Sequence, residues 1–501
     1  MGFSMLDWIV VAAYLGLVIV IGTSFYRKHK DAKDYLLAGR TMSWFPIAIS
    51  IIATDLSALS YLGVPALVYK TDLKYMSTAF TTPFQMALVV IIFVPLLYRL
   101  NIYTVYGYLE GRFNKEVRLA AAILFMGGRW AWLATMTFAT SVVLTEITGM
   151  NTVLAILICG LGTTFYTFLG GMEAIVWTDF MQFFVLVGGA VAIIIFILYG
   201  FGGDVGQIWS IAENAGHTKM FDFSTDFRAE FTFWGLLFGG LVYQISTYGT
   251  DQLNVQRYFA TKDLKSTIWA AMGSAIILLP VLLLLYAIGI GFVAYYQTNP
   301  ELAGTLTNPD RVMPHFTVNI LPDGLRGLVI AGIFAATMSS MSSGINSLST
   351  STIKDLLEHI SPKFQERELY WARVLCLGWG VLVTVSAVAL ISGQLTIIER
   401  FNSIYQLFAG PLVSIFLLGI LTKRASSLPV IVGAVVGFIT VILVSNLTPI
   451  FWLWYSPIGF LVSVSIGYLG SFIFPREMPD EPDNIISQNA AEEESLQEGS
   501  L

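Results

Sequence analysis

The sequence predicts an all-α integral membrane protein with about thirteen transmembrane helices. Its 501 residues are 56% hydrophobic and only 12% charged, whereas soluble domains carry about 25% charged residues. The apolar residues recur in stretches of about 20, which is the length that crosses the hydrocarbon core of a bilayer. Lys and Arg gather in alternate loops, as the positive-inside rule requires of a polytopic chain. Together these observations exclude a soluble domain with a single membrane anchor.

The 20-residue rule divides the chain into a series of predicted spans. Their approximate bounds are 6–26, 45–69, 75–98, 118–148, 152–170, 174–201, 231–250, 266–296, 325–357, 368–391, 396–421, 428–446 and 452–474. The first loop contains a basic cluster between residues 27 and 33, which predicts a cytoplasmic loop and an N-terminus outside. An odd number of spans then places the C-terminus inside, and most of the 27 Lys and Arg residues fall in inside loops.

The composition also predicts the domain organisation and the location. We expect residues 1–475 to form one polytopic domain, and residues 476–501, which are polar and acidic, to form a disordered cytoplasmic tail. Cys159 and Cys376 lie in apolar runs and are expected to be buried thiols. No cleavable signal peptide is evident, and the short loops favour a bacterial plasma membrane, that is, an inner membrane. The lipid bilayer is an expected partner, and nothing in the sequence indicates a nucleic acid or an obligate protein partner.

Four ionisable residues within predicted spans stand out: Asp55, Arg129, Glu146 and Asp179. Such groups cost roughly 2.5 kcal/mol or more in a bilayer, so each is a functional candidate. Glu146 lies near a helix end, which favours a structural pair, whereas Asp179 lies deep in an apolar helix, which favours a function. Arg129 could bind a solute, pair with Asp55 or extend its charge to the membrane surface.

Polar residues interrupt two of the predicted spans. The span at 45–69 contains, in order, Thr54, Asp55, Ser57, Ser60, Gly63 and Pro65, and the span at 231–250 is polar from Gln244 onward. Interrupted spans are the best sequence indication of a transporter site, because unwound carbonyls and half-helix ends can coordinate ions and solutes. If each break opens an inverted repeat of five helices, the repeats extend over about 45–201 and 231–421.

The ninth predicted span is unusually rich in serine. Its hydroxyl residues are Ser339, Ser340, Ser342, Ser343, Ser347, Ser349 and Ser351. Positions three and four apart share a helix face, so oxygens between residues 336 and 343 can converge. A hard cation such as Na⁺ prefers oxygen ligands, as Ca²⁺ and Mg²⁺ do. Close packing of small side chains is the alternative interpretation.

Several segments resemble the sodium/solute symporter family. They are DYLLAGRTMSWFP (34–46), DLSALSYLGVPALVY (55–69), LGGMEAIVWTDFMQ (169–182), TDQLNVQRYFATKD (250–263) and GINSLST (344–350). The segments follow one another in the family's order, and the nearest branches are the bacterial sialic acid, monocarboxylate/vitamin and iodide transporters. The resemblance implies a LeuT-type arrangement, with a leader helix, two inverted five-helix repeats in core spans 2–11, and extra C-terminal helices.

The resemblance also implies binding residues. A Na⁺ site would be formed by Ala53, Leu56, Ala336, Ser339 and Ser340, and a second Na⁺ site by Asp179, Ser339, Ser342 and Ser343. The solute would contact Asp55, Ser57, Ser60, Arg129, Gln244 and Tyr248. Arg129 aligns with a position that binds the substrate carboxylate in sialic acid-type members. Asp55 departs from that pattern, which has a neutral hydroxyl residue there.

We therefore expect a secondary active transporter, with Na⁺ as its only cofactor. It would couple inward Na⁺ flow to uptake of a small polar organic solute, such as a sialic acid or other sugar acid, a sugar, or a monocarboxylate or vitamin. Two alternatives remain within the same fold. One is coupling to protons instead of Na⁺, because two aspartates could titrate, and the other is transport of iodide or another anion. An enzyme is disfavoured because the four histidines fall in predicted loops and no HExxH or nucleotide-binding loop occurs. A passive channel is disfavoured because the polar residues gather at two helix breaks.

Overall fold

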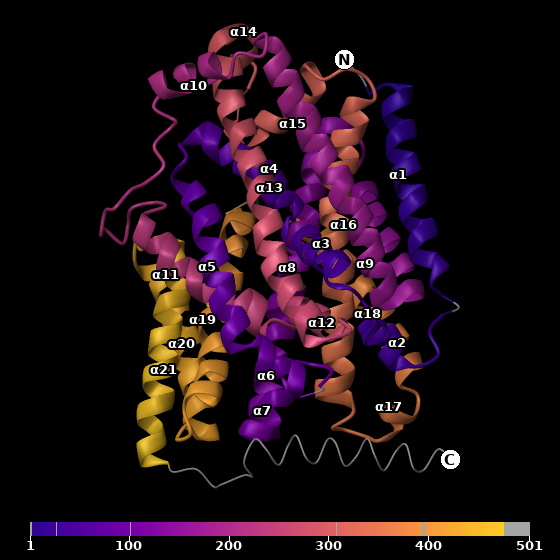
Figure 1. Cartoon of the computed structure of the whole chain (residues 1–501), viewed down its shortest axis with the longest axis vertical. Helices are drawn as coiled ribbons and strands as arrows, with labels where there is room; N and C mark the ends of the chain where they lie inside the picture. Colours follow the sequence, from indigo (N-terminus) through magenta and orange to yellow (C-terminus); the bar gives the residue numbers. More distant parts are fainter. Residues whose placement is uncertain (1–2, 27, 101, 307, 393–395, 475–501) are drawn as a thin grey trace.

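The computed structural model describes residues 3–26, 28–100, 102–306, 308–392 and 396–474, so the predicted tail at 476–501 lies outside it. These residues form an elongated bundle of helices without a β-strand, apart from one isolated bridge between Met42 and Thr261 (Figure 1). The helices of the first half are α1 (Met5–Ser24), α2 (Ala32–Leu37), α3 (Trp44–Asp55), α4 (Ala58–Lys70), α5 (Ser77–Ile92), α6 (Val94–Arg99), α7 (Gly107–Arg112), α8 (Lys115–Thr148), α9 (Thr152–Gly200) and α10 (Val205–Asn214).

The second half continues the bundle. Its helices are α11 (Phe233–Ile245), α12 (Gln252–Phe259), α13 (Leu264–Thr298), α14 (Pro300–Ala303), α15 (Val312–Asn319), α16 (Leu325–Ser351), α17 (Lys363–Glu366), α18 (Glu368–Ala389), α19 (Thr396–Leu421), α20 (Ser427–Leu447) and α21 (Tyr455–Ile473). Among the described residues, nine helices are long and apolar enough to cross a membrane, or ten if the bent pair α3 and α4 is one span.

Helix α9 contains two of the predicted spans. Its 49 residues would extend over about 74 Å at 1.5 Å per residue, more than twice the hydrocarbon thickness. The helix is broken at Gly171, which has φ 55° and ψ −158°. A Cβ atom at Gly171 would lie 2.6 Å from the carbonyl oxygen of Tyr35, so glycine is required both for the positive φ and for the contact with α2.

The predicted break in the second span is present. Helices α3 and α4 meet at 62°, and Leu56 between them has φ −76° and ψ 69°. The break lies against α16, whose residues 329–351 are buried throughout. A helix buried on every side forms the centre of a bundle, so the serine-rich helix and the broken helix meet in the interior.

A second break separates α11 from α12. The chain passes through a π-helical segment, η3 (Ser246–Thr250), and α12 then begins at Gln252. The Asp251 carboxylate caps α12 by accepting a hydrogen bond from the Leu253 amide at 2.9 Å. All eight residues of α12 are buried, so this polar segment enters the protein interior.

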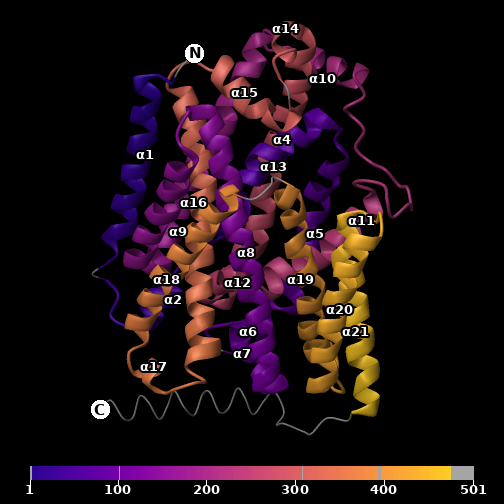
Figure 2. The same ribbon diagram turned by 180° about the vertical axis from the view of Figure 1, so that it is seen from behind.

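The outer helices expose apolar side chains. In Figure 2, α1 lies at one edge of the bundle, and α20 and α21 lie together at the other. Leu17 and Val20 of α1 and Leu461 and Leu469 of α21 are exposed, as a lipid-facing surface allows. Both cysteines are buried free thiols, which confirms the prediction for them.

Candidate cation and solute site

The break between α3 and α4 frees backbone carbonyls that α16 then satisfies. The Ser57 amide donates to the Asp55 carbonyl at 2.9 Å, and so departs from the helical bond to Ala53. The Ser339 hydroxyl donates to the Ala53 carbonyl at 2.7 Å, and the Ser340 hydroxyl donates to the Thr54 carbonyl at 2.7 Å. Buried carbonyls require such partners, so two serines of α16 hold the broken end of α3.

The same two hydroxyls also approach the Ala336 carbonyl, each at 3.2 Å. Residues predicted for the first Na⁺ site, Ala53, Ala336, Ser339 and Ser340, are thus brought together, and Leu56 lies at the corner of the break. The group consists of neutral carbonyl and hydroxyl oxygens, the ligand type that hard cations prefer. If the hydroxyl protons turned away from the carbonyls, the oxygens of both would be available to a cation.

The residues predicted for the second Na⁺ site surround an arginine. The Asp179 carboxylate accepts hydrogen bonds from the Ser50 hydroxyl at 2.6 Å and the Thr54 hydroxyl at 3.4 Å. It also forms an ion pair with Arg257 at 3.1 Å, and both side chains are almost completely buried. A buried carboxylate requires a compensating positive charge, and here α12 supplies it.

Arg257 is held by five groups. Besides Asp179, its guanidinium donates to the Ser50 hydroxyl at 2.8 Å, the Leu253 carbonyl at 2.6 Å and the Thr54 hydroxyl at 2.5 Å. It also donates to the Ser343 hydroxyl. Arg257 therefore connects α12 to α3, α9 and α16. Of these, α9 and α16 are the two helices that the predicted second cation would connect.

The other two members of that predicted set point elsewhere. Ser342 donates to the Ser339 carbonyl within α16 at 3.0 Å, and the Ser339 hydroxyl lies on Ala53. Of the four residues, Asp179 and Ser343 share partners, and these are Arg257 and Thr54. The assignment of a second Na⁺ to this set stays a prediction.

Four of the predicted solute residues lie around the two breaks. The Tyr248 hydroxyl of η3 donates to the Asp55 carboxylate, and the Asn254 amide donates to it at 3.3 Å. Ser57 is buried and Ser60 is half-buried, both at the start of α4. The first break therefore faces the second, with Asp55 and Tyr248 in direct contact. This contact places the midpoint of α3 and α4 beside η3.

The other two solute residues contact different groups. Gln244 donates to the Thr82 hydroxyl of α5 at 3.2 Å. Arg129 of α8 forms a buried ion pair with Asp251 and lies 4.9 Å from the Trp132 ring. The ion pair of Arg129 is with Asp251, and its predicted contact with the solute stays a prediction.

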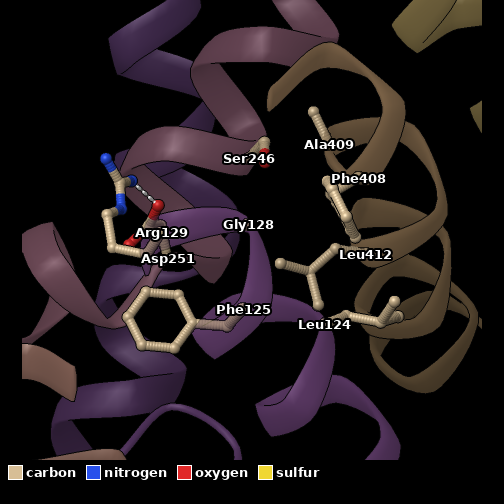
Figure 3. A pocket seen from close by; sticks show the side chains of 9 residues that line it. All are labelled: Leu124, Phe125, Gly128, Arg129, Ser246, Asp251, Phe408, Ala409 and Leu412. Atoms are coloured by element: carbon tan, nitrogen blue, oxygen red, sulfur yellow. Dashed lines mark hydrogen bonds and ion pairs between the residues drawn. The ribbon is translucent and has the colours of Figure 1, made fainter. Parts of the chain in front are cut away.

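Figure 3 shows a small cavity beside the Arg129 ion pair. It has a volume of about 10 Å³, which is space for about one water. Its walls come from α8, from η3 and Asp251, and from α19, where Phe408 and Leu412 face the pair. A second carboxylate at this arginine would lie close to the Asp251 carboxylate, and the two negative charges would repel each other.

Three of these residues were not expected from the sequence: Asp251, Asn254 and Arg257. The predicted seventh span ends at residue 250, so all three fell in a supposed loop. The signal was available, because a buried aspartate in the sixth span required a positive partner. Arg257 lies in the motif TDQLNVQRYFATKD, between apolar residues at helical spacing.

A second ionic cluster lies at the end of the bundle that contains α7 and α17 (Figure 1). Arg118 of α8 pairs with Glu110 of α7 at 2.6 Å and with Asp355, after α16, at 2.8 Å. His359 lies 3.1 Å from Glu110. Burial opposes the ionisation of Glu110, but the hydrogen bond and charge of Arg118 outweigh it and lower the pKa of this carboxyl.

The comparisons agree on one family. The profile of the Sodium:solute symporter family matches residues 35–440. The Sodium/sialic acid symporter NanT of Aliivibrio fischeri is 31% identical over 490 residues, covering 96% of each chain. Sodium-coupled monocarboxylate transporter 1 of Homo sapiens is 32% identical over 444 residues, covering 87% of this chain and 72% of that protein.

Solved structures agree with the sequence comparisons. A Na⁺-coupled sialic acid symporter in a substrate-bound, outward-open state superposes with a TM-score of 0.88 at 29% identity, covering 95% of this chain and 100% of that one. Mhp1, a nucleobase-cation-symport-1 family transporter, superposes with a TM-score of 0.55 at 15% identity, covering 88% and 94%. The second likeness shows the fold alone.

The all-helical bundle with two facing helix breaks defines a secondary active transporter. The family match extends over most of the sequence, and full-length relatives exceed 30% identity. The chain belongs to the sodium:solute symporter family. It is a multi-pass membrane protein that couples Na⁺ to the transport of a small solute, which confirms the predicted all-helical membrane fold, family and coupling ion, whereas the count of thirteen spans stays a prediction.

Proposed function

We propose that the protein takes up a small organic acid, either a sugar acid such as a sialic acid or a monocarboxylate, together with Na⁺. The relatives support this class, because they are named as sialic acid and monocarboxylate symporters. The observation that carries the coupling is the pair of hydrogen bonds from Ser339 and Ser340 to the end of α3. These two hydrogen bonds hold the end of the broken helix through the same oxygens that would bind a cation, so cation binding would change the geometry of that helix.

In the proposed cycle, Na⁺ binds to the carbonyls of Ala53, Leu56 and Ala336 and the hydroxyls of Ser339 and Ser340. The ion replaces the hydroxyl protons that now hold the carbonyls, and so fixes α3 and α16 in one arrangement. Binding to one arrangement shifts the population toward it by the differential affinity. The membrane potential contributes about 2.3 kcal/mol per charge per 100 mV, which drives each ion inward.

The second cation would compete with Arg257. Asp179 and Ser343 both contact that guanidinium, so Na⁺ at the predicted second set requires Arg257 to withdraw. Withdrawal leaves the net charge of the cluster unchanged, since one cation replaces another beside Asp179. We therefore propose that a second Na⁺ binds only in a state in which α12 has shifted away from α9.

The solute is proposed to bind between the two breaks. Ser57 and Ser60 would contact it from α4, and Gln244 and Tyr248 from α11 and η3. The hydrogen bond from Tyr248 to Asp55 would open to admit the solute. Arg129 would receive the solute carboxylate after exchanging it for Asp251, because guanidinium and carboxylate form bidentate pairs.

The transmembrane organisation is also proposed in more detail than the fold class. Thirteen spans, with the N-terminus outside and the C-terminus in the cytoplasm, fit the Lys and Arg distribution. Residues 1–475 would form the transporter domain, with repeats at about 45–201 and 231–421. The break in α9 at Gly171 supports counting that helix as two spans. A bacterial inner membrane is the proposed location.

Uptake into proteoliposomes tests the proposal. Radiolabelled sialic acid, lactate and a neutral sugar of similar size are offered with an inward Na⁺ gradient, an inward proton gradient or neither. Accumulation of an acid with the Na⁺ gradient alone is expected. Accumulation with the proton gradient alone would instead support proton coupling through Asp55 or Asp179. Transport of the neutral sugar but of neither acid would overturn the proposed substrate class.

A further inference from the structure

The lining of a second cavity comes from α4, α13 and α14 and from neighbouring loops, and Figure 1 shows the end of the bundle where α10, α14 and α15 gather. The cavity has a volume of about 370 Å³, within the range of small-molecule sites. Tyr69 and Lys70 from the end of α4, and Tyr296 and Gln297 from the end of α13, form two of its walls. Lys70 lies about 18 Å along α4 from its first residue, at 1.5 Å per residue. The cavity is therefore not the solute site at the break.

The walls of this cavity are fixed by specific contacts. The Tyr69 and Tyr296 rings meet edge to face at 5.7 Å. The Tyr296 hydroxyl lies 2.6 Å from His315 Nδ1, and the Thr305 hydroxyl lies 2.8 Å from His315 Nε2. These bonds attach the segment around α14 and α15 to the end of α13. The cavity thus has a floor of defined side chains rather than an open loop.

The charge of the lining is positive. The charge comes from Lys70, which is exposed; His217 also lines the cavity, and no Asp or Glu belongs to its lining among the described residues. The neighbouring Lys74 pairs with Asp72 and Asp222, but no carboxylate in the described part of the chain pairs with Lys70 in this way. Since an ammonium without a carboxylate in a partly enclosed site attracts anions, the cavity is suited to a negatively charged ligand.

The hydrogen bond of His217 fixes which of its ring nitrogens carries the hydrogen. Its Nδ1 lies 2.9 Å from the Val68 carbonyl, and a carbonyl only accepts, so Nδ1 carries the hydrogen. His217 therefore holds its ring against the end of α4 and turns Nε2 to the other side. A ligand with both a carboxylate and hydroxyl groups could bond to Lys70, to His217 Nε2 and to the Gln297 amide together.

We propose that this cavity is a second binding site, for a small organic carboxylate, distinct from the solute site at the helix breaks. The choice of a carboxylate among anions rests on the proposed function. A bound acid would join the end of α4 to α13 and to Pro300, Ala303 and Pro309. Since α4 is one half of the broken helix, occupancy would bias the angle at the break.

Titration calorimetry on the purified full-length protein tests the site. Sialic acid and lactate are titrated with Na⁺ and with choline in its place, because this cavity contains none of the predicted Na⁺ ligands. A Na⁺-independent binding component is expected for one of the acids. Lys70→Ala should weaken it by about tenfold, the usual loss for a charged hydrogen bond.

Two further variants separate the site from general damage. Ala303→Phe should also abolish the component, by filling the cavity without changing its charge. Lys265→Ala removes an exposed lysine at the opposite end of α13 and should leave the component unchanged. Absence of binding without Na⁺, or binding that survives both Lys70→Ala and Ala303→Phe, would overturn the proposal. If wild type shows no Na⁺-driven uptake, the proposed function fails instead. The titration without Na⁺ measures binding alone and does not depend on uptake.

Discussion

The serine contacts at the helix break predict how Na⁺ affinity responds to a single atom. In Ser340→Ala, the Na⁺-bound form loses a hydroxyl ligand, which is worth about 1.5–3 kcal/mol for a charged interaction. The Na⁺-free form loses the bond to the Thr54 carbonyl at 2.7 Å, which is worth about 0.5–1.5 kcal/mol. The difference, roughly 1–1.5 kcal/mol, predicts that the dissociation constant for Na⁺ rises by about tenfold.

The matched control lies two turns away on the same helix. Ser347 is equally buried, but its hydroxyl donates to Gly344 within α16 at 2.9 Å and does not reach the break. Ser347→Ala should therefore change the Na⁺ dissociation constant by less than about twofold, or about 0.4 kcal/mol. The two variants remove the same atom from the same helix, so general destabilisation affects them alike.

Thermal unfolding of the detergent-solubilised protein provides the measurement. A ligand that binds only the folded state raises the transition temperature with its concentration, so a Na⁺ series at constant ionic strength, balanced with K⁺, yields the dissociation constant. A shift in Ser340→Ala and none in Ser347→Ala is expected. If Ser340→Ala unfolds at a lower temperature but responds to Na⁺ as wild type does, the hydroxyl is a structural bond and not an ion ligand.

Three further predictions concern stability. Either Asp179→Asn or Arg257→Met should cost about 3–5 kcal/mol because it strands a buried charge; the double variant should unfold at a higher temperature than either single one, and additive losses would contradict the pairing. Gly171→Ala should reduce the yield of folded protein, because its Cβ would lie 2.6 Å from a backbone oxygen of α2; a wild-type yield after size-exclusion chromatography would refute this. Because the pKa of Glu110 is lowered in the folded protein, its carboxylate stabilises the fold above about pH 4.5, the ordinary pKa, and this stabilisation is lost as the pH falls through the lowered pKa. The unfolding temperature of wild type should therefore fall in that pH range. Glu110→Gln lacks the charge beside Arg118, so its unfolding temperature should not fall there.

The sequence predicted those parts of the protein that depend on local pattern. The break after Asp55 could be predicted because polar residues, a glycine and a proline interrupt an apolar run. The serine face of α16 could be predicted because helical spacing alone decides which hydroxyls converge. The family resemblance then joined these two segments, which lie far apart in the chain.

Pairing across long distances was harder to predict. The charge partner of Asp179 is Arg257, 78 residues away, and the partner of Arg129 is Asp251, 122 residues away. Hydropathy misplaced both partners, because α12 is polar in sequence yet buried in the fold. A hydropathy window scores the free energy of moving a residue from water into lipid. These residues are instead buried in a protein interior, where other side chains supply their partners. For the same reason, hydropathy alone does not settle the count of thirteen spans, which stays a prediction.

The two buried cysteines have a practical consequence. Cys159 and Cys376 are the only thiols in the sequence, and neither is exposed. A maleimide probe should therefore ignore the native chain, so that single cysteines introduced at the exposed ends of α4 and α20 would carry all the label. The distance between two spin labels at such positions would report the tilt of the broken helix. No native cysteine would have to be replaced first.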